Sequence, residues 1–176
     1  RYPELREEVV LVQVVVPSRE GVPEYDELKT EIEQLVGEIN GQFTQSGWVP
    51  IHFIYRSLDQ DNLLAYYRTA EAVLATPLKD GMNLVAKEYC ASSIEEVGVL
   101  VLSEFAGAAS QLGEDALLVN PYDVEATAER IREAYHMSTD ERRSRMQRLR
   151  KKVRETDIFW WVDSFLDAAP NPEPVD

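Results

Sequence analysis

The sequence contains little of what disulfides, metal clusters or membrane spans require. Its 176 residues include a single cysteine, Cys90, which excludes an internal disulfide and a metal site built from clustered cysteines. No apolar run approaches the roughly 18 residues that a membrane-spanning helix needs. Cationic residues are also scarce, 18 against 32 acidic ones. The resulting net charge of −14 argues against nucleic acid or an anionic membrane as the main partner, because both are themselves negative.

The chain also has neither an initiating methionine nor a recognisable signal peptide. It starts in the middle of a pattern, at Arg1, and we therefore expect a fragment of a longer protein, for which a missing leader is uninformative. Cys90 falls in an apolar stretch with helical spacing, where a small buried hydrophobe is expected. An unpaired cysteine is typical of a reducing compartment, so we expect a cytoplasmic location. His52 and His136 lack a carboxylate or cysteine at ligand spacing, and no metal site is predicted.

Short apolar stretches alternate with helical patterns along the whole chain. Hydrophobic residues make up 44% of it, which is enough for a packed core. Apolar runs predict strands at residues 8–16, 51–55, 72–75, 98–102 and 116–119. Helical spacing predicts helices at residues 24–40, 59–69, 83–92, 105–112, 124–136 and 139 to about 168. This alternation indicates the α/β class, with a doubly wound, Rossmann-like parallel sheet covered by helices.

Several local features refine this prediction. The first strand, EVVLVQVVV, is nearly all apolar, as in a strand buried on both faces. Asn40-Gly41 is a C-terminal signal that should end the first long helix. The basic run at residues 142–154 is interleaved with acidic and apolar residues, which favours a solvated helix face over a nucleic-acid patch. We expect residues 1–169 to form one domain and residues 170–176 to be a disordered tail.

One stretch, TPLKDGMNLVAKEY at residues 76–89, combines features of a binding site. It follows a predicted strand, and ligands of parallel sheets gather at the carboxyl ends of strands. It then opens a helix, whose unpaired first-turn amides of Asn83, Leu84 and Val85 would attract an anion. Gly81 can adopt a backbone conformation that other residues resist, and it lets a ligand approach the chain closely. Asp80 supplies a carboxylate beside this turn.

Glu88 lies one helical turn beyond Leu84 on the same face. Its carboxylate could accept two hydrogen bonds from a vicinal diol such as that of a ribose. A purely structural interpretation is also open, in which Asp80 only caps the helix, Gly81 only makes the turn, and Glu88 is only an exposed helical residue. The residues alone therefore predict a phosphate and polyol site and no more.

The motifs themselves resemble those of a known family. The stretch DGMNLVAKEY at residues 80–89 resembles the donor-site signature of trehalose-6-phosphate synthases and their relatives, which are retaining glycosyltransferases built from two Rossmann-like domains. Further stretches agree in order, namely QVVVPSR at 13–19, ING at 39–41, GWVPI at 47–51, VLVLSEFAGAA at 99–109 and LLVNPYD at 117–123. The resemblance covers nearly the whole chain, from about residue 9 to residue 165.

The resemblance implies roles for individual residues. Asp80, as the catalytic-site acid, would hold hydroxyls of the donor sugar together with Gly81, Met82 and Asn83. The amides of Leu84 and Val85 would meet the diphosphate, and Glu88 would bind the ribose hydroxyls. Arg19 would reach the phosphate of the acceptor, a role that suits the planar fork of a guanidinium. The functional residues implied by the resemblance are therefore Asp80, Gly81, Met82, Asn83, Leu84, Val85, Glu88 and Arg19.

The resemblance also implies the reaction. The family transfers glucose from UDP-glucose, or a similar nucleotide sugar, to glucose 6-phosphate with retention of configuration, and needs no metal or other cofactor. Departure of the diphosphate leaves an oxocarbenium-like sugar, so stabilising charge on the leaving group is the main task. The family's acceptor-binding N-terminal domain, and an arginine and a lysine that precede Val9, would lie outside this chain. We therefore expect the chain alone to be inactive.

Two alternatives to this reaction stay open at this stage. One is a related synthase with another acceptor, such as glycerol phosphate, because acceptor choice depends mainly on the other domain. The other is a catalytically silent regulatory homologue that keeps the fold and binds partners. The aromatic cluster of Phe159, Trp160, Trp161 and Phe165 is interpreted as an apolar helix face. In an isolated chain this face could mediate self-association.

Overall fold

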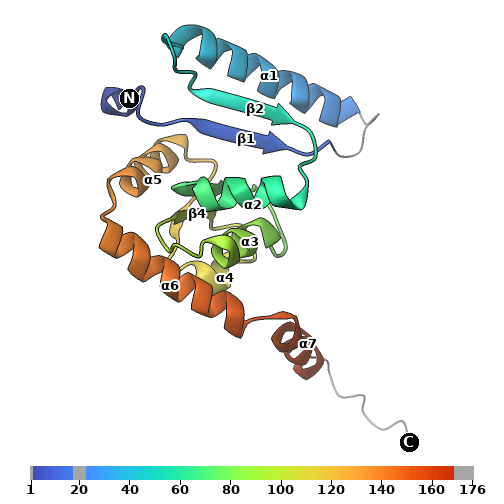
Figure 1. The fold of residues 1–176 in the computed structure, drawn as a ribbon. Coiled ribbons are helices and arrows are strands. Elements are labelled where there is room, and N and C mark those ends of the chain that lie inside the picture. Colours follow the sequence, from blue (N-terminus) through green and yellow to red (C-terminus); the bar gives the residue numbers. More distant parts are fainter. Residues whose placement is uncertain (1, 18–22, 169–176) are drawn as a thin grey trace, which may run out of the picture. The chain divides into compact units, whose positions relative to one another are not determined.

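The computed structural model describes residues 2–17 and 23–168, and these form two compact units, residues 1–62 and residues 63–176. Figure 1 shows the helices and strands in chain order. The predicted acceptor-phosphate residue, Arg19, lies outside the described residues, and so does the predicted tail at 170–176.

The first unit is a strand–helix–strand motif. After a 3₁₀ turn, η1 (Pro3–Leu5), strand β1 (Leu11–Val15) leads through helix α1 (Pro23–Phe43) to strand β2 (Ile51–Tyr55). The two strands pair in parallel, with Leu11 opposite Ile51. The long helix between them is the crossover that parallel pairing requires. The indole nitrogen of Trp48 donates a hydrogen bond to the carbonyl of Val9 at 3.0 Å. This bond links the segment that precedes β2 to the segment that precedes β1.

Helix α1 does not end at Asn40-Gly41, contrary to the prediction, and continues to Phe43. The reason lies in a long-range contact of the Asn40 side chain. Its Nδ2 donates to the carbonyl of Ile51 at 2.9 Å, and its Oδ1 accepts from the amide of Ile51 at 3.1 Å. Asn40 thus fastens the helix to β2. The left-handed glycine in this region is Gly47, with φ of 84°.

Strand β1 is less covered than its sequence predicted. Leu11 and Val12 are about two-fifths exposed, at 42% and 41%, where an all-apolar strand was expected to be buried on both faces. The physical reason is the size of the unit, since two strands and one helix supply too few neighbours to bury both faces. Among its described residues, the first unit contains none that is fully buried.

The second unit contains a three-stranded parallel sheet with the order β3-β4-β5. Its strands are β3 (Ala72–Ala75), β4 (Val99–Ser103) and β5 (Leu117–Val119). Helix α2 begins in the last residues of the first unit and leads into β3. The helices are α2 (Gln60–Thr69), α3 (Leu84–Ser92), α4 (Ala109–Leu112), α5 (Val124–His136), α6 (Thr139–Glu155) and α7 (Ile158–Asp167).

The central strand β4 separates two apolar clusters, because successive side chains of a strand point to opposite faces. On one face, Leu100 and Leu102 pack in a cluster with Tyr89 of α3 and Met146 of α6. On the other face, Val99, Val101, Leu117 and Val119 pack with Ala134 of α5 and with Met137. Helices therefore cover both faces of this sheet, which agrees with the predicted α/β class and parallel pairing.

Cys90 lies in the same interior. Its side chain is 0% exposed, and burial raises the pKa of its thiol to about 12. A thiol that stays protonated at neutral pH is a poor nucleophile and a poor metal ligand. The predicted interpretation of Cys90 as a small buried hydrophobe is confirmed.

The basic run was predicted to form a solvated helix face, and most of its cationic residues are exposed, but two arginines of α6, Arg142 and Arg150, are buried. Arg142 donates from Nε to the carbonyl of Met137 at 3.0 Å, and from Nη2 to the carbonyls of Ala134 and Tyr135 at 2.8 and 2.9 Å. It thereby satisfies carbonyls that the end of α5 leaves without helical partners. Arg150 donates to the carbonyl of Ser93, just after α3, at 2.8 Å.

The long helix predicted from residue 139 to about 168 is divided in two. Helix α6 ends at Glu155, and Asp157 then caps α7 by accepting the amide of Trp160 at 2.9 Å. A side-chain cap competes with continuation of the helix, which explains the break. The aromatic side chains of α7 are exposed, from 41% for Trp161 to 75% for Phe159.

Candidate functional site

The candidate site is the segment between β3 and α3, at the carboxyl end of the sheet. Strand β3 ends at Ala75, and α3 begins at Leu84. Midway along the connection, Asp80 forms a parallel bridge with Ala106, which follows β4. The amide of Gly107 donates to the carbonyl of Asp80 at 2.9 Å. The connection after β3 is therefore fastened to the connection after β4 at the edge where ligands of parallel sheets bind.

The carboxylate of Asp80 organises the turn that precedes α3. Its Oδ1 accepts the amides of Met82 and Asn83 at 3.0 and 2.9 Å, and its Oδ2 accepts Nδ2 of Asn83 at 3.0 Å. The hydrogen bond from the amide of Met82 is the main reason that the pKa of Asp80 lies below its ordinary value, and those from Asn83 add to it. Asp80 is therefore a carboxylate at neutral pH, able to accept hydrogen bonds but not to donate a proton.

Asn83 carries the unusual backbone of this turn. It lies in the left-handed region, with φ of 64° and ψ of 76°, and is the N-cap of α3. Its Oδ1 accepts the amide of Ala86 at 2.9 Å. Asparagine is one of the few side chains that tolerate this conformation. The sequence had suggested Gly81 for this role, but Gly81 is not among the described residues with positive φ.

Two glycines meet in this turn, and they differ in how much room they have. A Cβ built on Gly81 would have no neighbour within 4 Å, so Gly81 faces open space. A Cβ on Gly107 would lie 2.0 Å from the carbonyl oxygen of Gly81 and 2.6 Å from its carbon. Gly107 is thus sterically required by the turn. From the sequence, residues 104–108 were expected to pack the loop beneath the site, and the contacts of Gly107 agree with that expectation.

The first turn of α3 presents two amides without partners. The amide of Asn83, predicted to be free, is taken by Asp80. Among the described residues, no hydrogen-bond partner is found for the amides of Leu84 and Val85. Both residues are exposed, at 57% and 46%. Unpaired amides at a helix N-terminus, together with the helix dipole, favour an anion.

Glu88 is exposed on α3, one turn beyond Leu84. Its Oε2 accepts the phenol hydroxyl of Tyr67, which comes from α2, at 3.3 Å. Tyr67 is nearly buried, at 9% exposure, and burial, followed by the nearby charge of Glu88, raises the pKa of its phenol to about 12. Tyr67 is therefore a neutral donor to a carboxylate. Sequence reasoning missed this contact, because helical spacing marks Tyr67 only as part of α2.

The structure places the predicted donor-site residues on one continuous segment. Asp80, Gly81, Met82 and Asn83 form the turn, and Leu84, Val85 and Glu88 follow on α3. Arg19 is the exception, since it lies outside the described residues. The purely structural interpretation, in which Asp80 only caps the helix, is wrong in its residue, because the N-cap of α3 is Asn83 and Asp80 holds the turn before it. Its carboxylate still has unused lone pairs with which to bind a ligand.

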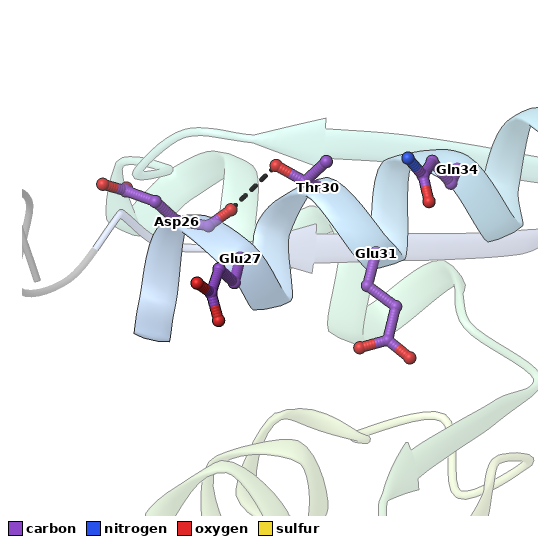
Figure 2. A pocket seen from close by; sticks show the side chains of 5 residues that line it. All are labelled: Asp26, Glu27, Thr30, Glu31 and Gln34. Carbon is purple, nitrogen blue, oxygen red and sulfur yellow. Dashed lines mark hydrogen bonds between the residues drawn. The ribbon is translucent and has the colours of Figure 1, made fainter. Parts of the chain in front are cut away.

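The described residues hold no group of three or more acidic, histidine or cysteine side chains that could bind a metal ion. None of the helices in the described part of the chain is long and apolar enough to cross a membrane. A hollow of about 350 Å³ lies along α1 in the first unit, lined by Asp26, Glu27, Thr30, Glu31 and Gln34. As Figure 2 shows, these side chains all come from that helix. Three carboxylates make this hollow unsuitable for a diphosphate.

A family model described as glycosyltransferase family 20 matches residues 1–171. The chain belongs to this family. It is 48% identical over 165 residues to the bifunctional trehalose-6-phosphate synthase/phosphatase of Thermoproteus tenax, which covers 94% of this chain and 22% of that protein. It is 44% identical over 171 residues to the trehalose-6-phosphate synthase of Mycobacterium avium, covering 97% of this chain and 35% of that protein. The predicted family resemblance is confirmed.

Solved structures agree with the sequence relatives. A trehalose-6-phosphate protein of E. coli, bound with UDP-2-fluoro glucose, superposes with a TM-score of 0.90 at 39% identity, over 95% of this chain and 37% of that chain. This likeness confirms the predicted α/β fold of this family 20 chain. The chain spans between about a fifth and just over a third of the length of these relatives.

Proposed function

We propose that this family 20 chain is the donor-binding part of an α,α-trehalose-phosphate synthase, which moves glucose from UDP-glucose to glucose 6-phosphate with retention of configuration. The relatives named above support the reaction class. The observation that carries the donor-binding role is the pair of unpartnered amides of the exposed residues Leu84 and Val85, beside the turn that Asp80 organises. In this proposal residues 1–169 belong to one donor-binding domain, and the acceptor-binding domain belongs to the same longer protein.

The amides of Leu84 and Val85 bind the diphosphate of the donor. In a retaining transfer the bond between the sugar and the diphosphate breaks, and negative charge grows on the leaving oxygen. Amides already oriented by α3 stabilise this charge without having to reorganise, and this is the main source of catalysis in such sites. The net charge of −14 does not forbid such a site, because amides in direct contact with a diphosphate act over a much shorter distance than the field of the whole chain.

The turn residues hold the sugar. Asp80 is ionised and accepts hydrogen bonds from hydroxyls of the glucose, while Gly81 leaves room for the sugar to approach. Met82 and Asn83 complete the turn around the same ring. Because its pKa is lowered, Asp80 does not protonate the leaving group. Its contribution is to orient the donor and the turn.

Glu88 accepts the ribose hydroxyls, and Arg19 pairs with the phosphate of glucose 6-phosphate in this proposal. The chain alone is expected to be inactive, because a transfer needs both sides of the cleft, and the acceptor side belongs to the other domain. Activity of the purified chain with UDP-glucose and glucose 6-phosphate would contradict that expectation.

The test of the proposed function is isothermal titration of the chain with UDP and with UDP-glucose. We expect binding with a Kd in the micromolar to low-millimolar range, about −8 to −4 kcal/mol. Replacement Glu88→Ala should weaken it. The matched control is Glu114→Ala, which removes the same charge at an exposed position just before β5. Removing a carboxylate from either position should by itself strengthen the binding of an anionic nucleotide. If Glu88→Ala weakens binding and Glu114→Ala does not, Glu88 therefore contacts the nucleotide directly.

The same titration can contradict the proposal. Absence of binding by a chain that is folded by circular dichroism would favour a catalytically silent homologue. Equal affinities in the wild type and in Glu88→Ala would remove Glu88 from the site while leaving the amides of Leu84 and Val85 as the anion site.

A further inference from the structure

The contact between Tyr67 and Glu88 joins two helices at the edge of the candidate site. Tyr67 comes from α2 and Glu88 from α3, and the two are 21 residues apart in the chain. The Tyr67 ring lies edge-on to the ring of Tyr89, with centroids 6.2 Å apart. Tyr89 is 0% exposed. The phenol of Tyr67 is thus held on a fixed support, with its hydroxyl directed at an exposed carboxylate.

We propose that Tyr67 is a positioning residue for the ribose-binding carboxylate of Glu88, and that it sets the preference of the site for ribose over 2′-deoxyribose. This inference rests on the proposed function, in which Glu88 receives the ribose hydroxyls. Tyr67 itself does not contact the ligand. It holds Oε2 of Glu88. Oε1 has no hydrogen-bond partner among the described residues, so it and the second lone pair of Oε2 remain available to the ribose hydroxyls.

The physical reason is the freedom of an exposed glutamate. Three rotatable bonds let its carboxylate sample many positions, and fixing them costs free energy when a ligand binds. A hydrogen bond to an ionised acceptor is stronger than one between neutral groups. Tyr67 therefore fixes the carboxylate before the nucleotide arrives, and a diol, which needs two acceptor positions at once, benefits more than a single hydroxyl.

A simpler explanation of the contact is that the Tyr67 hydroxyl needs a partner because it is nearly buried, and Glu88 supplies one. The two explanations predict different effects of removing the hydroxyl. If Glu88 only satisfies Tyr67, the ribose preference of Tyr67→Phe equals that of the wild type. If Tyr67 positions Glu88, the preference falls.

The experiment titrates the whole 176-residue chain with UDP and with 2′-deoxy-UDP and compares the two dissociation constants. We expect the wild type to prefer UDP, Glu88→Ala to lose the preference, and Tyr67→Phe to lower it by about threefold to tenfold, the range set by the net strength of one hydrogen bond. Tyr67→Phe combined with Glu88→Ala should match Glu88→Ala alone, because Tyr67 acts through Glu88.

The neighbouring Tyr66 provides a matched control. It lies on the same helix, is exposed at 36%, and Tyr66→Phe removes the same hydroxyl without touching Glu88. Phenylalanine keeps the ring that packs on Tyr89, so Tyr67→Phe should fold, which thermal unfolding checks. Glu88→Asp tests the same contact from the exposed side, since shortening the side chain draws the carboxylate away from Tyr67, and the preference should fall there too.

The outcomes separate this inference from the proposed function. A wild-type preference that is unchanged in folded Tyr67→Phe, or lowered equally by Tyr66→Phe, overturns the positioning role and leaves the donor site intact. A wild type that binds neither nucleotide, or a ribose preference unaffected by Glu88→Ala, overturns the proposed role of Glu88 itself.

Discussion

Replacing Gly107 by alanine would place a methyl group inside the turn that carries Asp80. The new Cβ would lie 2.0 Å from the carbonyl oxygen of Gly81, 2.6 Å from its carbon and 3.1 Å from the amide nitrogen of Met82. A carbon and an oxygen in van der Waals contact are more than about 3 Å apart, so the backbone must move by about 1 Å or more. All three atoms belong to backbone, which cannot yield as a flexible side chain would.

The cost has two parts. Overpacking of this kind typically destabilises by about 1–3 kcal/mol. Moving the turn also strains the hydrogen bond from Gly107 to the carbonyl of Asp80, at 2.9 Å, whose loss costs about 1 kcal/mol. We therefore expect Gly107→Ala to lower the free energy of unfolding of the second unit by about 2–4 kcal/mol. UDP binding should fall at least tenfold, because the amides of Leu84 and Val85 follow the displaced turn.

The matched control is the glycine on the other side of the same contact. Gly81 has open space where its Cβ would lie, so Gly81→Ala should change the unfolding free energy by less than about 1 kcal/mol. If a sugar approaches Gly81 closely, this variant should still weaken UDP-glucose more than UDP. Thermal unfolding and nucleotide titration of both variants make the comparison. Equal stabilities of Gly107→Ala and Gly81→Ala would refute the steric argument.

Three further predictions concern single side chains. Arg142→Met should lower the free energy of unfolding by about 2–4 kcal/mol, because it leaves buried carbonyls at the end of α5 without donors. The exposed control Arg143→Met should change it by no more than about 0.5 kcal/mol. Similar midpoints of urea unfolding for the two variants would contradict this expectation. Asn40→Ala should cost about 1 kcal/mol, because the loss of two hydrogen bonds to Ile51 outweighs better helix propensity, and amide exchange of Ile51 should accelerate. Folding lowers the pKa of Asp80. The ionised carboxylate therefore stabilises the folded chain at pH values above the ordinary pKa of an aspartate, and this stabilisation is lost as the pH falls through the pKa that Asp80 has in the folded chain. The difference in unfolding free energy between wild type and Asp80→Asn should therefore narrow between about pH 5 and pH 2. A difference independent of pH would contradict the role of the Asp80 carboxylate in holding the turn.

The candidate site could be proposed from local sequence, because the predicted donor-site residues lie within one turn and one helix. The Asp-Gly-Met-Asn order marks a strand-to-helix turn, and the resemblance of the chain's motifs predicted the family, which the family match confirms. The separate roles of the residues inside the turn could not be predicted in this way. Whether Gly81 or Asn83 adopts positive φ depends on hydrogen bonds to Asp80 and on the room beside Gly107.

The apolar runs of the sequence determined the five strands and the α/β class, because strand and helix periods are local properties of a chain. Only the tertiary structure decided where α1 ends, which arginines of α6 are buried, and that Tyr67 meets Glu88. Each of these depends on a partner distant in sequence, such as Ile51 for Asn40 or the end of α5 for Arg142. A local pattern records what one segment prefers, whereas such contacts exist only once the fold has brought two segments together.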